Sequence, residues 1–154
     1  MKIKSLLIVM FFLLPAMISA VSQEECSQEV LFKFYPKGFV LEVLDKHDIP
    51  KGKAQKIADS LYEADQQVVM IIGQKASTMS PNPLEDIKAD KERAQLFRDS
   101  LMEVFNDVMA QNGVTDNDDI KVMLDEIQQM RMQRFDQCRK QGLLPKMPSE
   151  NIRN

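Results

Sequence analysis

Few residues of this chain belong to the types that carry out catalysis or hold metal ions. The single histidine, His47, lies between Asp45 and Asp48 and could be imagined as a metal ligand. A solvated helix end fits this pattern better, because a cationic imidazole is favourable beside the C-terminal end of a helix dipole. We therefore predict no metal site at His47.

An acidic run at 116–119 resembles the opening of a calcium-binding loop. Such a loop needs glycine at its sixth position and glutamate at its twelfth, where this chain has Lys121 and Ile127. Acidic side chains are also favoured in the first turn of a helix. The run therefore predicts a helix start, and we expect no metal and no other cofactor.

Nucleophilic catalysis is not indicated either. A serine or cysteine nucleophile needs a neighbouring base, and the only histidine lies near no glycine-flanked serine. The carboxylates are spaced with basic residues, as in Asp136 with Lys140, which is typical of ion pairs on a helix surface. We predict that the protein is not an enzyme.

The N-terminal residues have the composition of an export signal. Lys2 and Lys4 precede an apolar run at 6–14, and small residues follow up to Ala20. This order predicts a signal peptide at 1–20, with an uncleaved membrane anchor as the alternative. The run is about half of the twenty or so residues that cross a bilayer, so we expect no stable membrane span after processing and a periplasmic or secreted protein.

Two cysteines, Cys26 and Cys138, follow this leader. An exported chain meets oxidising conditions, under which two cysteines tend to pair. We therefore predict a Cys26–Cys138 disulfide that joins the start of the mature chain to its last helix. Two free buried thiols and a bridge between two chains are the alternatives.

The net charge of the mature chain argues against nucleic acid as a partner. Without Lys2 and Lys4, 18 of the 20 basic residues remain against 23 acidic ones, so the formal charge is −5. Phosphate backbones are bound by basic patches, whereas lysine and arginine are interleaved here with acidic residues. We expect no nucleic-acid binding.

Apolar residues recur at spacings of three and four along the chain, and no alternating strand pattern competes with them. This predicts an all-α fold in which one or two short helices within 22–48 precede three long amphipathic helices arranged in hairpins. The long helices are expected at about 50–78, 84–113 and 115–142. The helical domain would span 21–142, and a flexible tail would follow at 143–154.

The ends of the long helices are marked by specific residues. Pro81 and Pro83 are incompatible with a helix and separate the first two. Gly113 and Gly142 are expected to end the second and third in the left-handed conformation. Thr115 is the expected N-cap of the third.

Helices of about 26 to 29 residues are long for a chain of this size. Long thin hairpins leave part of each apolar stripe uncovered unless another chain covers it. We therefore expect the protein to bind other proteins through an apolar helical face, and a homodimer is one form of that association.

Methionine is the unusual apolar residue of the mature chain. The eight methionines after the leader are Met70, Met79, Met102, Met109, Met123, Met130, Met132 and Met147. A methionine-lined groove accepts varied apolar ligands, although gap filling in a thin core is an equal alternative. Met130 and Met132 cannot share one helix face, so at least one is expected off the core stripe. The candidate contacts for an apolar partner are Met70, Met109, Met123 and Phe105.

Two of the long helices begin in a related way. One start reads Ile49, Pro50, then Gln55, Lys56 and Ile57, and the other reads Val114, Thr115, Asp116, then Ile120. These starts resemble the Leu-Thr-x-x-Gln helix starts of the Spy and CpxP family of periplasmic helical proteins, with Lys53 and Asp118 at the two Gln positions. The resemblance implies an all-helical fold, often a cradle-shaped dimer, and a role as an ATP-independent chaperone or as an envelope-stress or metal-response protein.

These features together predict an exported helical module that binds proteins, of which a periplasmic chaperone-like or envelope-stress protein is one form. A secreted carrier of a small apolar ligand is one alternative, in which the same residues line a cavity between helices. A non-catalytic assembly subunit of an envelope or secretion machine is the other.

Overall fold

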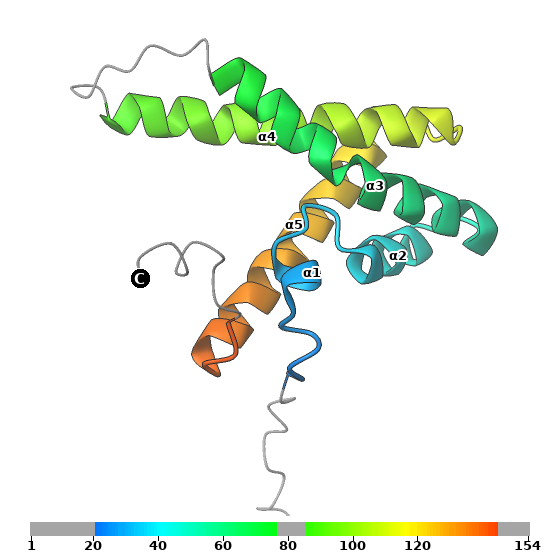
Figure 1. The fold of residues 1–154 in the computed structure, drawn as a ribbon. Helices are drawn as coiled ribbons and strands as arrows, with labels where there is room; N and C mark the ends of the chain where they lie inside the picture. The colour runs from blue at the N-terminus through cyan, green and yellow to red at the C-terminus, as the bar shows by residue number, and fades with distance from the viewer. Residues whose placement is uncertain (1–20, 77–85, 145–154) are drawn as a thin grey trace, which may run out of the picture.

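A computed structural model of the chain describes residues 21–76 and 86–144, and over these residues it contains helices and no strand (Figure 1). The prediction of an all-α fold is therefore confirmed. The helices are α1 (Gln28–Leu31), α2 (Lys37–Lys46), α3 (Lys51–Ala76), α4 (Asp86–Gln111) and α5 (Asn117–Lys140). The predicted leader, the proline connection and residues 145–154 of the predicted tail lie outside the described residues.

The third long helix begins differently from the prediction. Its N-cap is Asp116, not Thr115, and the Asp116 carboxylate accepts the backbone N–H groups of Asp118 at 3.0 Å and Asp119 at 3.1 Å. A carboxylate at this position satisfies two free donors and also interacts with the positive end of the helix dipole, which favours it over a hydroxyl. Gly113 and Gly142 have φ values of 68° and 69°, the left-handed conformation predicted for them.

The chain before α2 is less helical than its composition indicates. Of the segment at 22–34, only the single turn of α1 is α-helical. Residues 22–27 form turns instead, in which the N–H of Cys26 donates to the Gln23 carbonyl at 3.2 Å. Because α1 is a single turn, it has little stability of its own, and its position depends on the residues that it packs against.

The helices form a hairpin with a second group of helices set across one end (Figure 1). α3 and α4 run in opposite directions and pack against each other, and α2 lies against the first part of α3. α5 starts near the end of α4 and runs away from the hairpin at a steep angle, in contact with both α2 and α4. α1 packs mainly against α5.

The main core lies where α2, α3, α4 and α5 meet. Its largest fully buried side chains are Tyr35, Phe105, Leu44, Ile57, Leu61, Leu101, Met109, Ile120, Met123 and Ile127. The Tyr35 hydroxyl donates to the Leu101 carbonyl at 2.6 Å, and the Tyr35 and Phe105 rings stack with their centroids 5.9 Å apart. Among the described residues, burial ends at Val68 on α3 and begins at Ser100 on α4, so the far part of the hairpin contributes little to this core.

A buried carboxylate fixes the segment between α1 and α2. Asp65 of α3 accepts the backbone N–H of Phe34 at 2.6 Å and that of Tyr35 at 3.3 Å. The Lys33 ammonium lies 3.9 Å from the same carboxylate. Because a buried carboxylate is stable only when it is well partnered, these contacts hold residues 33–35 against α3 and thereby place the chain on both sides of them.

Candidate functional site

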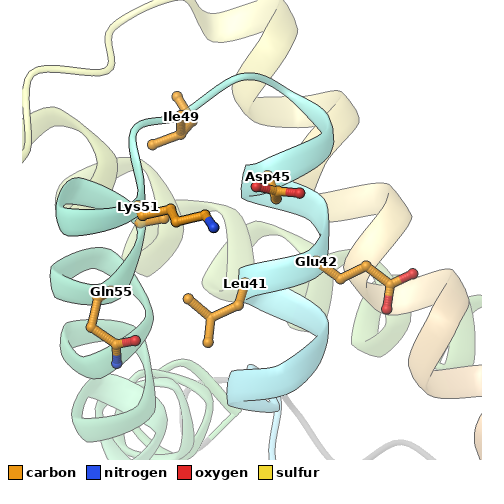
Figure 2. A pocket seen from close by; sticks show the side chains of 7 residues that line it. Leu41, Glu42, Asp45, Ile49, Lys51 and Gln55 are labelled. Carbon is orange, nitrogen blue, oxygen red and sulfur yellow. The ribbon is translucent and has the colours of Figure 1, made fainter.

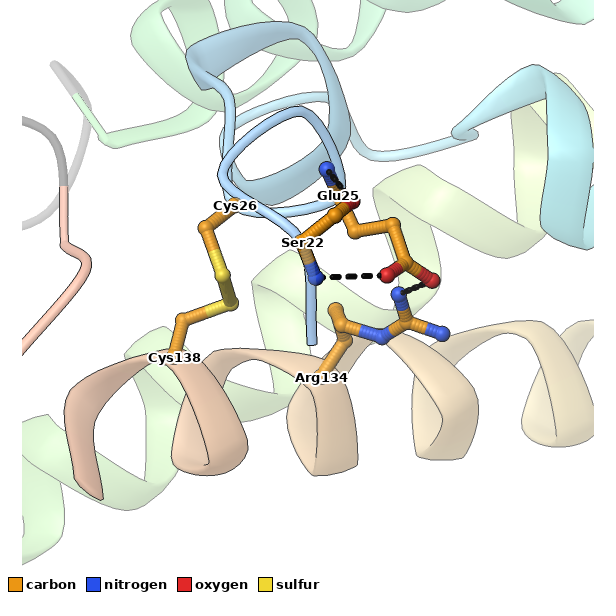
Figure 3. Close-up of a disulfide and its surroundings, with 5 residues drawn as sticks. All are labelled: Ser22, Glu25, Cys26, Arg134 and Cys138. Carbon is orange, nitrogen blue, oxygen red and sulfur yellow. Dashed lines mark hydrogen bonds and ion pairs between the residues drawn. A yellow bond between two sulfur atoms is a disulfide. The ribbon is translucent and has the colours of Figure 1, made fainter. Parts of the chain in front are cut away.

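The two cysteines are joined within one chain, as predicted. Their sulfur atoms lie 2.05 Å apart, and both residues are buried (Figure 3). They form a small second core with Leu31, against which Val21 and Leu143 pack. The disulfide therefore fastens the chain around α1 to the end of α5, and the packed part of the molecule reaches Leu143, one residue beyond the predicted boundary at 142.

An ion pair lies beside the disulfide (Figure 3). The Arg134 guanidinium of α5 donates to the Glu25 carboxylate, which also accepts the backbone N–H of Ser22 at 2.8 Å. The hydrogen bonds from Ser22 and then from Arg134 lower the pKa of Glu25 to about 2. The pair is a second link between the N-terminal segment and α5, and it depends on pH.

Replacing Glu25→Gln is expected to flatten the acid dependence of stability. The pKa of Glu25 is depressed in the folded state, so its ionised form stabilises the protein above the unfolded-state pKa of about 4.3. That contribution is lost as the pH falls toward 2, the pKa of Glu25 in the folded protein. Urea unfolding of both proteins at several pH values should show Glu25→Gln less stable near neutral pH and equal to the wild type at the acid end.

The exposed neighbour Glu24 provides the matched control for this experiment. Glu24→Gln should leave the difference in stability between neutral and acid pH nearly unchanged. An identical pH profile for Glu25→Gln and the wild type would show that the ion pair contributes nothing to stability.

The candidate apolar contacts do not lie together on the surface. Phe105, Met109 and Met123 are fully or almost fully buried in the main core, whereas Met70 of α3 is 58% exposed. This placement differs from the prediction for the first three. Helical periodicity marks the face that packs inward, and these three side chains are in phase with that face. They are therefore core residues, and no partner can touch them in the folded protein.

Other large apolar side chains are exposed instead. Among the described residues they are Phe32, Val69, Met70, Val122, Met132, Phe135 and Leu144. Three of these line a single open cavity of about 310 Å³ between the chain at α1 and the second half of α5. We call this cavity the α1–α5 groove; its lining residues are Leu31, Phe32, Arg131, Met132, Phe135 and Asp136.

Arg131, which lines the α1–α5 groove, also packs against an aromatic ring. The Arg131 guanidinium carbon lies 5.6 Å from the centre of the Phe34 ring, and this ring meets Phe97 of α4 edge-on at 5.4 Å. Arg131 also donates to the Gln128 side chain at 2.9 Å, and Gln128 donates to the Phe34 carbonyl at 2.8 Å. Burial lowers the pKa of Arg131, because the charged guanidinium is partly withdrawn from water.

Another cavity among the described residues has a different character. It measures about 400 Å³, lies between α2 and α3, and is lined by Leu41, Glu42, Asp45, Ile49, Lys51, Ala54 and Gln55 (Figure 2). Figure 2 shows charged and amide side chains from both helices around it, with Glu42 pointing away. Its large apolar lining residues, Leu41 and Ile49, are half-buried and pack against the main core.

The described residues hold no group of three or more histidine, cysteine or acidic side chains that could bind a metal ion. His47 is the C-cap of α2, but its side chain turns toward α5, where its Nε2 atom lies 3.7 Å from the Glu126 carboxylate. The sequence predicted a solvated His47 side chain, whereas the structure places this side chain in a partly buried environment. In the part of the chain that the structure describes, no helix is long and apolar enough to span a membrane.

Sequence reasoning missed the residues that form the α1–α5 groove. Phe135 is in phase with the core stripe of α5, yet its side chain is 37% exposed because it lies at the margin of that stripe. Met132 is 68% exposed, while Met130 packs against the main core, which agrees with the expectation that the two face different ways. For Met132, its position out of phase with the core stripe was the available signal, whereas the in-phase Phe135 gave none. No family model, curated protein or solved structure matches this chain.

Proposed function

We propose that this protein is an exported helical module that binds apolar segments of other polypeptides in the α1–α5 groove, with chaperone-like character. One observation carries the proposal: Phe32, Met132 and Phe135 are exposed large apolar side chains, and they line the same cavity. Single exposed apolar residues are ordinary on protein surfaces, but a cluster of them in a groove is typical of a binding site.

The size and openness of the groove favour a polypeptide over a small ligand. Sites for small molecules are enclosed clefts of roughly 300 to 1,000 Å³ that bury most of the ligand. The α1–α5 groove, at about 310 Å³, lies at the low end of that range and is open along the molecular surface. Aromatic and methionine side chains in such a groove can adapt to different apolar side chains of a passing segment.

The disulfide supports an exported location. Disulfides persist in oxidising compartments and are rare in reducing ones, so the buried Cys26–Cys138 pair indicates an oxidising environment. The leader-like composition of residues 1–20 agrees with this environment. Together they support a periplasmic or secreted protein.

An aggregation assay tests the proposal. The oxidised protein should slow the aggregation of a urea-denatured client at a near-stoichiometric ratio, in buffer without reductant, because a reductant would also open the disulfide. The double variant Met132→Ser/Phe135→Ser should bind the client about tenfold more weakly or worse, as expected when central apolar contacts are removed. Circular dichroism and thermal unfolding should show that the variant remains folded.

Met70→Ser is the matched control, since Met70 is also highly exposed but lies on α3, outside the groove. It should slow aggregation as well as the wild type does. An equal loss in Met70→Ser and in the double variant, or no activity in the wild type, would contradict the assignment of binding to the α1–α5 groove.

A further inference from the structure

The charge of Arg131 is incompletely balanced in the folded protein. Among the side chains that the structure describes, Arg131 forms no ion pair with a carboxylate; its contacts are the Gln128 amide oxygen and the Phe34 ring. The acid that acts on it electrostatically is Asp65, whose carboxylate already accepts two backbone N–H groups and lies 3.9 Å from the Lys33 ammonium. The buried Asp65 carboxylate therefore interacts with two cations, Lys33 and Arg131.

The neighbouring arginines of α5 differ from Arg131 in this respect. Arg134 is paired with Glu25, and the Arg139 guanidinium lies 2.9 Å from the Asp136 carboxylate. Asp136 also lines the groove, and Arg139 forms an ion pair with it. Of the two charged residues that line the groove, Asp136 is therefore paired, whereas Arg131 contacts a neutral amide and an aromatic ring.

A guanidinium in this setting is suited to bind a carboxylate. It has five N–H donors in a planar fork, and Gln128 accepts from only one of its nitrogen atoms. Hydrogen bonds between arginine and a carboxylate are stronger than neutral ones and become stronger still when water is partly excluded. A carboxylate from a bound ligand would therefore balance the positive charge of Arg131.

The spacing of Arg131 and Phe135 along α5 indicates the conformation of a polypeptide ligand. Arg131 and Phe135 are one helical turn apart, which places them about 6 Å from each other along the helix axis. Side chains two residues apart on an extended segment lie on the same side at about 6.6 Å. An extended polypeptide can therefore place an apolar side chain beside Phe135 and a carboxylate beside Arg131 when one residue separates the two.

We propose that the α1–α5 groove selects extended polypeptide segments in which an aromatic or large aliphatic residue and an aspartate or glutamate stand two positions apart. The apolar side chain packs among Phe32, Met132 and Phe135, and the carboxylate binds the Arg131 guanidinium. This inference rests on the proposed function, because it names the chemistry of the segment that the same groove binds.

Two matched peptides test the selection. One is a capped, fluorescently labelled peptide containing Phe-Ser-Asp in a neutral glycine and serine background, and the other contains Phe-Ser-Asn in the same background. By fluorescence anisotropy, the oxidised protein should bind the aspartate peptide about tenfold more tightly, equivalent to about 1.4 kcal/mol. Arg131→Gln should abolish this preference and leave the affinity for the asparagine peptide within about twofold of the wild type.

Lys121→Gln is the matched control, because it removes an equal charge from the same helix at an exposed residue near the start of α5 that does not line the groove. It should keep the tenfold preference. The ratio of the two affinities is also insensitive to partial unfolding of a variant, since unfolding lowers both apparent affinities equally.

Several outcomes separate failure of this inference from failure of the proposed function. A wild type without preference, or a preference that survives Arg131→Gln, overturns the inference. The proposed function still stands in those cases if Met132→Ser/Phe135→Ser weakens binding of the asparagine peptide. Binding of neither peptide overturns both. Displacement of the aspartate peptide by decanoate at equal or lower concentration would instead assign the groove to a small acidic lipid and overturn the polypeptide ligand.

Discussion

Replacing Cys26 and Cys138 together by serine is expected to lower the free energy of unfolding by about 4 kcal/mol. The two residues are 112 positions apart, so the disulfide closes most of the described chain into one loop. In the chain-entropy treatment, a cross-link over a loop of this length restricts the unfolded chain enough to stabilise the fold by roughly 4 to 5 kcal/mol. Urea unfolding of the oxidised wild type and the double serine variant, without reductant, measures the difference.

The lower free energy of unfolding should be accompanied by more frequent local opening of the N-terminal segment. Cys26 and Cys138 belong to the small second core and not to the main one, so α2 to α5 should stay helical by circular dichroism. Hydrogen exchange should rise around α1, because its main packing partner is α5. Reduced wild type is the control and should match the double variant. A difference below about 1 kcal/mol would show that residual structure in the unfolded chain removes most of the entropic effect.

Phe105→Ala is expected to lower the free energy of unfolding by about 3 to 5 kcal/mol, the range for deleting a large buried aromatic side chain. Phe105 is fully buried and stacks against Tyr35. Its removal leaves a cavity at the place where the helices of the main core meet, and helices fixed by several neighbours collapse only partly into such a space. The midpoint and slope of urea unfolding give the change in free energy.

The same variant distinguishes a core residue from a binding residue. At a temperature where Phe105→Ala is still folded, its affinity for the aspartate peptide should equal that of the wild type. Met132→Ala should behave in the opposite way, with stability within about 0.5 kcal/mol of the wild type and weaker binding. Weaker binding in Phe105→Ala at full folding would contradict its assignment to the core.

The helices could be predicted from the sequence because they follow local rules. Apolar spacing, two left-handed glycines and the prolines after α3 are properties of neighbouring residues, and the observed ends of α3, α4 and α5 differ from the expected ones by only a few positions. The disulfide followed from an even count of cysteines in a chain predicted to be exported. The N-cap was predicted one residue too early, at Thr115, because threonine and aspartate both cap helices and the two stand side by side.

The groove could not be predicted in the same way, because it is a tertiary feature. Its walls come from residues about a hundred positions apart, and no spacing rule indicates that Phe32 lies beside Phe135. The methionines that looked adaptable, Met109 and Met123, are in phase with the inward faces of α4 and α5, so they fill the core. The half-buried charge of Arg131 depends on the placement of Phe34, which Asp65 of a third helix determines.

The two walls of the α1–α5 groove are also synthesised at different times, because they lie near opposite ends of the described chain. Phe32 and Cys26 belong to the first part of the chain to be synthesised after the predicted leader, whereas Met132, Phe135 and Cys138 belong to the last helix that the structure describes. If the protein is exported, a chain that has crossed the membrane only in part has one wall of the groove, and a chain whose thiols are not yet oxidised holds the two walls together without the disulfide. Under the proposed function, the protein would therefore reach its full affinity for clients only after its own translocation and oxidation are complete.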